Sequence, residues 1–190
     1  MKKIISILVI GLGISSSNMS FATDGNSSTH AVSVIIPEVA LLDLESSGSP
    51  NFTLGFTPPT EAGLGLTAPL TSSSIWLNYS SIVASTGEVS RTISAQVTSG
   101  TIPSGAQLTV KVSQDDGGGA GNVGTRVSNQ FIPVTTSITP LITNVRSCYT
   151  GTGQTGHSLT YTLALIPGSY ASLKHNESTT LTVTYTLSDL

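Results

Sequence analysis

Two glycine-rich stretches of the chain have the spacing of a dinucleotide-binding loop. Gly119, Gly121 and Gly124 form one Gly-x-Gly-x-x-Gly pattern, and residues 151–156 form a second. Dinucleotide binding requires a helix directly after the glycines, because N–H groups at a helix N-terminus bind the pyrophosphate. Irregular or strand-like sequence follows both stretches, so we interpret them as turns between strands.

The histidines and one acidic pair are the next candidates for chemistry. His30, His157 and His175 are scattered without the spacing of metal ligands, so we expect surface or strand histidines. Asp115 and Asp116 could coordinate calcium, which prefers several oxygen ligands. They lack the alternating acidic pattern of known calcium loops, and a solvated loop is the preferred interpretation.

Three further carboxylates, those of Glu38, Asp43 and Glu45, flank Pro37. A pair of opposed carboxylates can act as acid and base. Nothing in the sequence sets two of these side chains opposite each other, and solvated strand ends are the simpler interpretation. We therefore expect no enzyme activity, no cofactor and no bound metal.

Aromatic side chains and a single thiol complete the candidate residues. Trp76, Tyr79, Tyr149 and Tyr161 have flat faces that could stack on a sugar ring, although core packing is the alternative. Cys148 is the only cysteine, so an intrachain disulfide is impossible. A buried free thiol is our preferred interpretation, and intermolecular pairing is the other.

The first 22 residues are typical of a secretory signal peptide. Lys2 and Lys3 precede an apolar run over residues 4–14, and Ser20-Phe21-Ala22 fits the small-x-small cleavage rule. Cleavage would leave residues 23–190 as a single domain, exported to the periplasm, the cell surface or the medium. No other stretch is long and apolar enough to predict a membrane span.

Composition restricts the partners of the exported chain. Only 9% of the residues are charged, and Ser and Thr together account for 57 of 190. Without Lys2 and Lys3 the chain has 5 basic and 10 acidic side chains, a net charge of −5. This balance argues against nucleic acid and against anionic membrane surfaces.

Alternating polarity predicts the strands that must position these residues. The clearest case is residues 180–187, where Leu181, Val183, Tyr185 and Leu187 share one face and threonines share the other. We expect the apolar row to be buried. Further strands are expected over residues 30–36, 39–44, 52–56, 74–80, 88–98, 107–113, 131–134, 138–145 and 157–166.

Many short strands separated by Gly, Pro and Ser turns predict an all-β fold, either a β-sandwich or a barrel. Prolines at several places indicate sheet edges and changes of sheet, so an antiparallel β-sandwich of about 8–10 strands is preferred. Residues 170–174 could form one helical turn, and we expect no longer helix. Residues 88–98 and 107–113 are expected to pair as a hairpin. Residues 30–36 and 39–44 are expected to be two strands, with a change of sheet at Pro37.

The segment Val32-Ser-Val-Ile-Ile and the closing Leu181-Thr-Val-Thr-Tyr-Thr-Leu resemble bacterial fimbrial subunits and their spore-coat-U-like relatives. The resemblance implies an incomplete immunoglobulin-like sandwich, completed by an N-terminal strand from the next subunit. It also implies a periplasmic chaperone that binds the C-terminal strand. The lone Cys148 departs from the pattern, because many such subunits contain a disulfide.

Two classes of function follow from the sequence. The first is a non-catalytic structural or adhesive surface protein, which associates with itself or with other surface subunits. The second is a secreted carbohydrate-binding module that uses the aromatic side chains to bind a glycan. Val32–Ile36 could pair within its own domain or with another subunit, and these alternatives separate the two classes. Pairing within its own domain is the preferred expectation.

Overall fold

The computed structural model describes residues 25–67, 72–175 and 177–190. The predicted signal peptide, residues 1–22, lies outside the described residues. The chain divides into two units, one up to Ile35 and one over Ile36–Leu190. The second unit contains all the strands described below.

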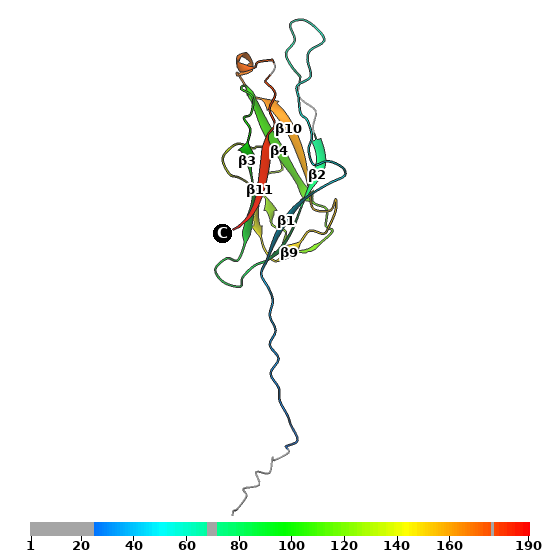
Figure 1. Ribbon diagram of the computed structural model, residues 1–190, viewed down its shortest axis with the longest axis vertical. Coiled ribbons are helices and arrows are strands. Elements are labelled where there is room, and N and C mark those ends of the chain that lie inside the picture. The colour runs from blue at the N-terminus through cyan, green and yellow to red at the C-terminus, as the bar shows by residue number, and fades with distance from the viewer. Residues whose placement is uncertain (1–24, 68–71, 176) are drawn as a thin grey trace, which may run out of the picture. The chain divides into compact units, whose positions relative to one another are not determined.

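Two antiparallel sheets form this unit (Figure 1). The long strands of the first sheet are, in spatial order, β1 (Val39–Ser46), β2 (Ser72–Ile82), β10 (His157–Leu165) and β4 (Ala106–Asp115). Two-residue strands extend it: β5 (Ala120–Gly121), β9 (Cys148–Tyr149) and β7 (Ile132–Pro133). The second sheet has the order β11 (Thr182–Asp189), β3 (Arg91–Ser99), β8 (Thr139–Val145) and β6 (Thr125–Arg126).

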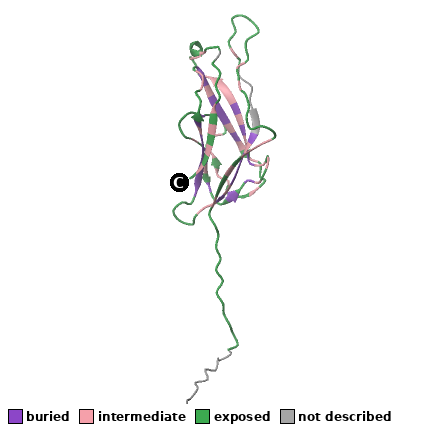
Figure 2. Ribbon diagram, viewed as in Figure 1, coloured by how far each residue is buried: buried purple, intermediate pink, exposed green. Residues whose placement is uncertain are grey.

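This arrangement confirms the predicted all-β sandwich. The described residues contain one helical element, the 3₁₀ turn η1 (Tyr170–Ser172), within the range where a single turn was expected. Side chains of alternate residues enter the core between the sheets, as period-two sequence requires. Figure 2 shows that the buried positions are concentrated in the strands, while most loop residues are exposed.

Residues with almost no exposed surface define the centre of the core. They come from both sheets and include Leu77, Ile93, Val110, Val112, Leu141, Ile142, Val145 and Leu159. Cys148 is also buried, as its preferred interpretation predicted. Burial, followed by the charge of Asp115, raises the pKa of the Cys148 thiol to about 11.

The expected hairpin between β3 and β4 is wrong. β3 pairs with β11 and β8, whereas β4 pairs with β10 and β7 in the other sheet. The intervening turn therefore carries the chain from one sheet to the other. Gly100 enters this turn with a φ of +84°, and a Cβ there would lie 2.2 Å from the carbonyl oxygen of Thr180.

Two expected strands are absent from the described residues. Residues 25–38 belong to no strand, so the predicted pair of strands around Pro37 reduces to β1. Residues 52–56 are also outside any strand, and the Phe52 ring packs against the Tyr161 ring with centroids 5.2 Å apart. In both cases alternation supplies an apolar face but does not define a partner strand.

Candidate functional site

The C-terminal strand β11 lies at one edge of the second sheet. It pairs with β3 in antiparallel register, with Val183 opposite Val97 and Leu187 opposite Ile93. Among the described residues, none pairs with the other side of β11. A strand in this position presents unpaired N–H and C=O groups, which are a template for another strand.

The alternation predicted for β11 is present, but its apolar row is less buried than expected. Thr182, Thr184 and Thr186 are exposed, and Val183, Tyr185 and Leu187 point toward the core. These three side chains are only half-buried, whereas their partners on β3 are fully buried. The difference arises because β3 has a neighbour on both sides and β11 does not.

The strand that lies next to β11 in the other sheet is β1, and its inward residues are also half-buried. Both strands thus leave apolar surface uncovered along the same side of the sandwich. We call this surface the open edge; it consists of Leu42, Leu44, Leu181, Val183, Tyr185 and Leu187.

A tyrosine pair links the two sheets behind the open edge. The hydroxyl groups of Tyr161 on β10 and Tyr185 on β11 are hydrogen-bonded to each other. Burial raises the pKa of Tyr161 to about 12 and raises the pKa of Tyr185 well above its ordinary value. Both phenols keep their protons, so one hydroxyl donates and the other accepts in this pair.

Arg91 closes one end of the open edge. Its side chain is only 2% exposed, and it donates to Asp189 Oδ1 on β11 (2.6 Å) and to Ser81 Oγ on β2 (3.1 Å). It also donates to a carboxylate oxygen of Glu38 and to the carbonyl oxygen of Val39, where β1 begins. One guanidinium thus fixes the start of β1 beside the end of β11.

The segment before β1 is extended and exposed. Val32, Val34 and Ile36 form its alternating apolar row, with 72%, 81% and 78% of their surfaces exposed. Residues in such a row normally lie against a core. This segment therefore has the pattern of an edge strand without a sheet to join.

The aromatic residues proposed for sugar stacking do not share one exposed face. Tyr79 and Tyr161 are buried in the core, Trp76 is half-buried, and Tyr149 is exposed. Tyr79 instead stacks on His157, with ring planes 6° apart and centroids separated by 5.8 Å. The structure therefore does not bring the four rings together as a binding platform.

His157 is a buried strand histidine in this arrangement. Its Nδ1 lies 2.9 Å from the carbonyl oxygen of Ser113, and its Nε2 lies 2.9 Å from the Tyr79 hydroxyl. Burial lowers the pKa of His157, against opposing contributions that include the bond to Ser113 and the charge of Asp115. The Tyr79 hydroxyl has a single proton, which it donates to the carbonyl oxygen of Val123.

The two glycine-rich stretches pack against each other rather than around a ligand. A Cβ on Gly119 would lie 1.7 Å from the carbonyl oxygen of Tyr149, and one on Gly151 would lie 3.0 Å from that of Gly118. The backbone N–H of Asp116 donates to the carbonyl oxygen of Gly156 (3.3 Å). The glycines thus allow close contact between two turns.

Acidic and histidine side chains do not gather into a metal site in the part of the chain that the structure describes. Asp115 accepts from the N–H of Gly117 (3.1 Å), and Asp116 follows it into the turn. His30 and His175 are exposed.

Sequence reasoning placed Arg91 in a strand without recognising its role, although an arginine in an otherwise apolar alternating row was the available signal.

Comparison of the chain with protein-family models, with curated proteins and with solved structures gave no match. Within the described residues, no helix is long and apolar enough to cross a membrane. In the part of the chain that the structure describes, the fold is a two-sheet all-β sandwich with the open edge along β1 and β11.

Proposed function

We propose that the protein is a non-catalytic surface subunit that assembles with further copies of itself by donating a strand. One observation carries the proposal: the open edge has unpaired backbone and half-exposed apolar side chains, and the same chain has an exposed alternating segment. The open edge lacks a neighbouring strand, and the exposed segment lacks a sheet to join. Strand addition to an exposed sheet edge is a recurrent mode of recognition.

The strand order supports an incomplete immunoglobulin-like sandwich. An immunoglobulin sandwich places strands A, B, E and D in one sheet and strands C, F and G in the other. The neighbours β1, β2, β10 and β4 follow the first order, and β3 paired with β11 follows C and F. Strand G would lie beside β11, at the open edge. This vacancy agrees with the resemblance to fimbrial subunits.

The energetic gain from filling the edge is substantial. Burying Val32, Val34 and Ile36 contributes roughly 5–8 kcal/mol. Association costs about 4–15 kcal/mol in lost freedom of motion. Backbone hydrogen bonds to β11 and burial of the open edge itself must therefore supply the remainder of a stable contact.

Donation to another copy is favoured over folding back within one chain. Only Pro37 separates Ile36 from Glu38, which Arg91 holds at the start of β1. A strand beside β11 belongs to the sheet opposite β1, about 10 Å away. The three residue steps from Ile36 to Val39 span at most about 11 Å. To pair with β11 of its own chain, the segment would have to cross to the other sheet and also reverse its direction. A link that is already fully extended cannot do both, so pairing with another copy replaces the initial expectation of pairing within the domain.

Light scattering coupled to size-exclusion chromatography tests the proposal on the exported protein. We expect the mean mass to rise with concentration, and Val34→Asp to leave a folded monomer because the charge would enter the core of the acceptor. Ser33→Asp is the matched control, since its side chain points to the other face and assembly should persist. A monomer at all concentrations, or equal loss of assembly in both variants, would refute strand donation.

A carbohydrate-binding function through the aromatic residues is the weaker candidate, because Tyr79 and Tyr161 are buried.

Export to the periplasm or the cell surface remains part of the proposal. It rests on the predicted signal peptide and is tested by the N-terminal mass of the exported protein, which we expect to begin at Thr23.

A further inference from the structure

A polar hollow lies on the side of the sandwich away from the open edge. β6 is the last strand of the second sheet, at the edge opposite β11, and the end of β4 faces it from the first sheet. Between them is a hollow of about 460 Å³, which we call the Arg126 hollow. It is lined by Gln114, residues 123–129 and His157. Its volume is within the range of small-molecule sites.

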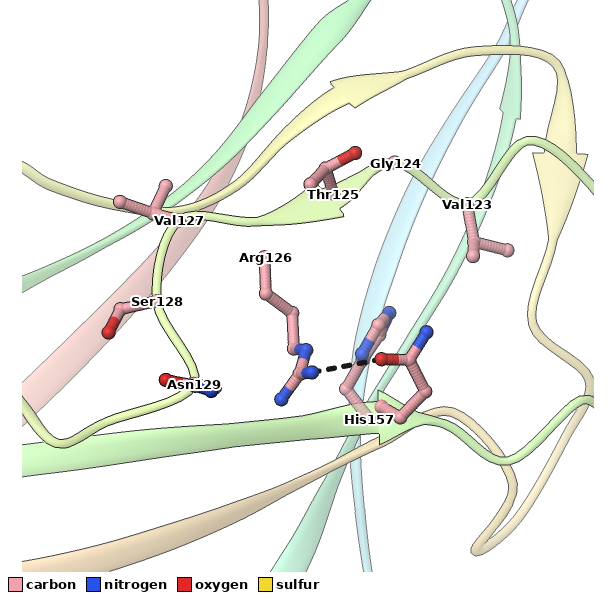
Figure 3. Close-up of a pocket in the computed structure, with 9 residues that line it drawn as sticks. Val123, Gly124, Thr125, Arg126, Val127, Ser128, Asn129 and His157 are labelled. Carbon is pink, nitrogen blue, oxygen red and sulfur yellow. Dashed lines mark hydrogen bonds between the residues drawn. The ribbon is translucent and has the colours of Figure 1, made fainter.

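Arg126 provides the charge of this hollow. Figure 3 shows its side chain reaching from β6 across the hollow toward His157. One terminal nitrogen donates to the carbonyl oxygen of Val112 (3.0 Å), and the other donates to Gln114 Oε1 (2.9 Å). Both acceptors belong to β4, so the guanidinium is held in one orientation before any ligand arrives.

The half-buried guanidinium lacks a carboxylate partner. Both ion pairs found among residues 25–67, 72–175 and 177–190 belong to Arg91, and Arg126 has only neutral acceptors. A partly buried charge is costly unless an opposite charge or several hydrogen bonds compensate it. A guanidinium has five N–H donors, and two of its bonds are accounted for here. Donors remain for an anion in the hollow.

Most of the other side chains that line the hollow are neutral and polar, and two, Val123 and Val127, are apolar. Thr125 and Ser128 contribute hydroxyl groups, and Gln114 and Asn129 contribute amides. His157 forms the wall, with both ring nitrogens already occupied. One cation among several hydroxyls and amides suits a ligand with one negative charge and many hydroxyl groups.

We propose that the Arg126 hollow binds an acidic sugar, with the sugar carboxylate on the guanidinium of Arg126 and its hydroxyl groups on Ser128 and Asn129. Arginine binds carboxylates through parallel hydrogen bonds, which fixes their orientation. The site does not depend on strand donation. In a polymer joined through β11, however, every copy would present it on the free side, and weak single sites would act together.

Saturation-transfer NMR with glucuronic acid tests this site on the exported protein, with glucose as the neutral probe of the same size. We expect saturable binding of glucuronic acid only, weakened by salt. Arg126→Gln should weaken binding about tenfold or more, because a charged hydrogen bond is lost. Arg146→Gln is the matched control, since it removes the same charge from an exposed position.

Asn129→Ala provides a second variant at an exposed position, should Arg126→Gln fail to fold. It should reduce glucuronic acid binding several-fold while leaving thermal unfolding unchanged. Equal binding of glucose, equal losses in the Arg126 and Arg146 variants, or unchanged binding in Asn129→Ala would overturn the proposal. Stronger binding of an acidic peptide such as N-acetyl-Asp-amide would also overturn it, by assigning the hollow to protein carboxylates.

Discussion

Arg91 stabilises the sandwich through the number of groups it joins. Its guanidinium donates to β1, β2 and β11, and all of its own surface except 2% is buried. The Glu38 carboxylate that it contacts is largely exposed, so that ion pair alone contributes little. The hydroxyl of the buried Ser81 and the carbonyl oxygen of the partly buried Val39 would lose this donor if the arginine were removed, and unpaired buried groups are costly.

Arg91→Ala is therefore expected to lower the free energy of unfolding by about 3–5 kcal/mol, the range for breaking a buried charged network. Urea titration followed by tryptophan fluorescence measures the change. Arg146→Ala is the control, because this arginine is exposed and its loss should change stability by about 0.5 kcal/mol or less. Similar losses from the two variants would show that Arg91 has no special role.

We expect His157 to make the free energy of unfolding depend on pH. Its pKa is lowered in the folded state, chiefly by burial, so the unfolded chain binds a proton more readily than the folded chain. The neutral ring contributes fully to the free energy of unfolding above about pH 6.5, which is the pKa of histidine in the unfolded chain. This contribution declines as the pH falls below that value.

In His157→Gln, the free energy of unfolding should therefore fall less steeply between about pH 7 and pH 5. The altered packing would add a constant difference at every pH. Urea titrations across this range measure the slope. His175→Gln should keep the slope of the unaltered protein, because His175 is exposed. A slope unchanged by His157→Gln would assign the pH dependence to other groups.

At the scale of elements, β11 has a different energetic role in the single chain and in the proposed polymer. Val183 is half-buried, whereas its partner Val97 on β3 is 3% exposed. The uncovered part of Val183 contributes nothing to the stability of one copy. In the proposed polymer, a donated strand would cover the open edge and bury this part of Val183.

Val97→Asp is expected to cost several kcal/mol and to prevent folding, because it places a charge in the core. Val183→Asp should cost about 1–2 kcal/mol in dilute monomer yet abolish assembly. Thr184→Asp, on the exposed face of the same strand, should have little effect on either. Denaturation of dilute protein and light scattering at high concentration measure the two properties separately. Equal destabilisation by Val97→Asp and Val183→Asp would mean that β11 is already fully covered.

The sequence predicted the strands better than their partners. Residues 157–166 and 180–187 alternate clearly and became β10 and β11, since a period of two defines the two faces of a strand. The same alternation does not identify which strand pairs with which, and for this reason the predicted pairing of β3 with β4 was wrong. Arg126 had no sequence signal, because its partners on β4 are brought to it only by the fold.

At the scale of the whole molecule, the direction of the donated strand determines the form of the assembly. The donating segment joins β1 at Glu38, which Arg91 places beside Asp189 at the end of β11. If the donated strand runs antiparallel to β11, the donor sandwich lies near Leu181 of the acceptor, away from the acceptor's own segment. Such a head-to-tail contact repeats from one copy to the next. If it runs parallel, two copies can exchange segments and close a dimer.

Antiparallel pairing is slightly more stable per residue, so we expect open polymers. The register in which Ile36 faces Val183 would place Val32 opposite Leu187 and Val34 opposite Tyr185. We predict that oxidation of Val32→Cys/Leu187→Cys, in a Cys148→Ser background, yields a ladder of covalent multimers on a denaturing gel. The matched pair Val32→Cys/Val183→Cys should remain uncross-linked, because Val32 opposes Val183 only in the parallel direction. Covalent dimers from the Val183 pair, with no ladder from the Leu187 pair, would instead establish a closed exchange of segments between two copies.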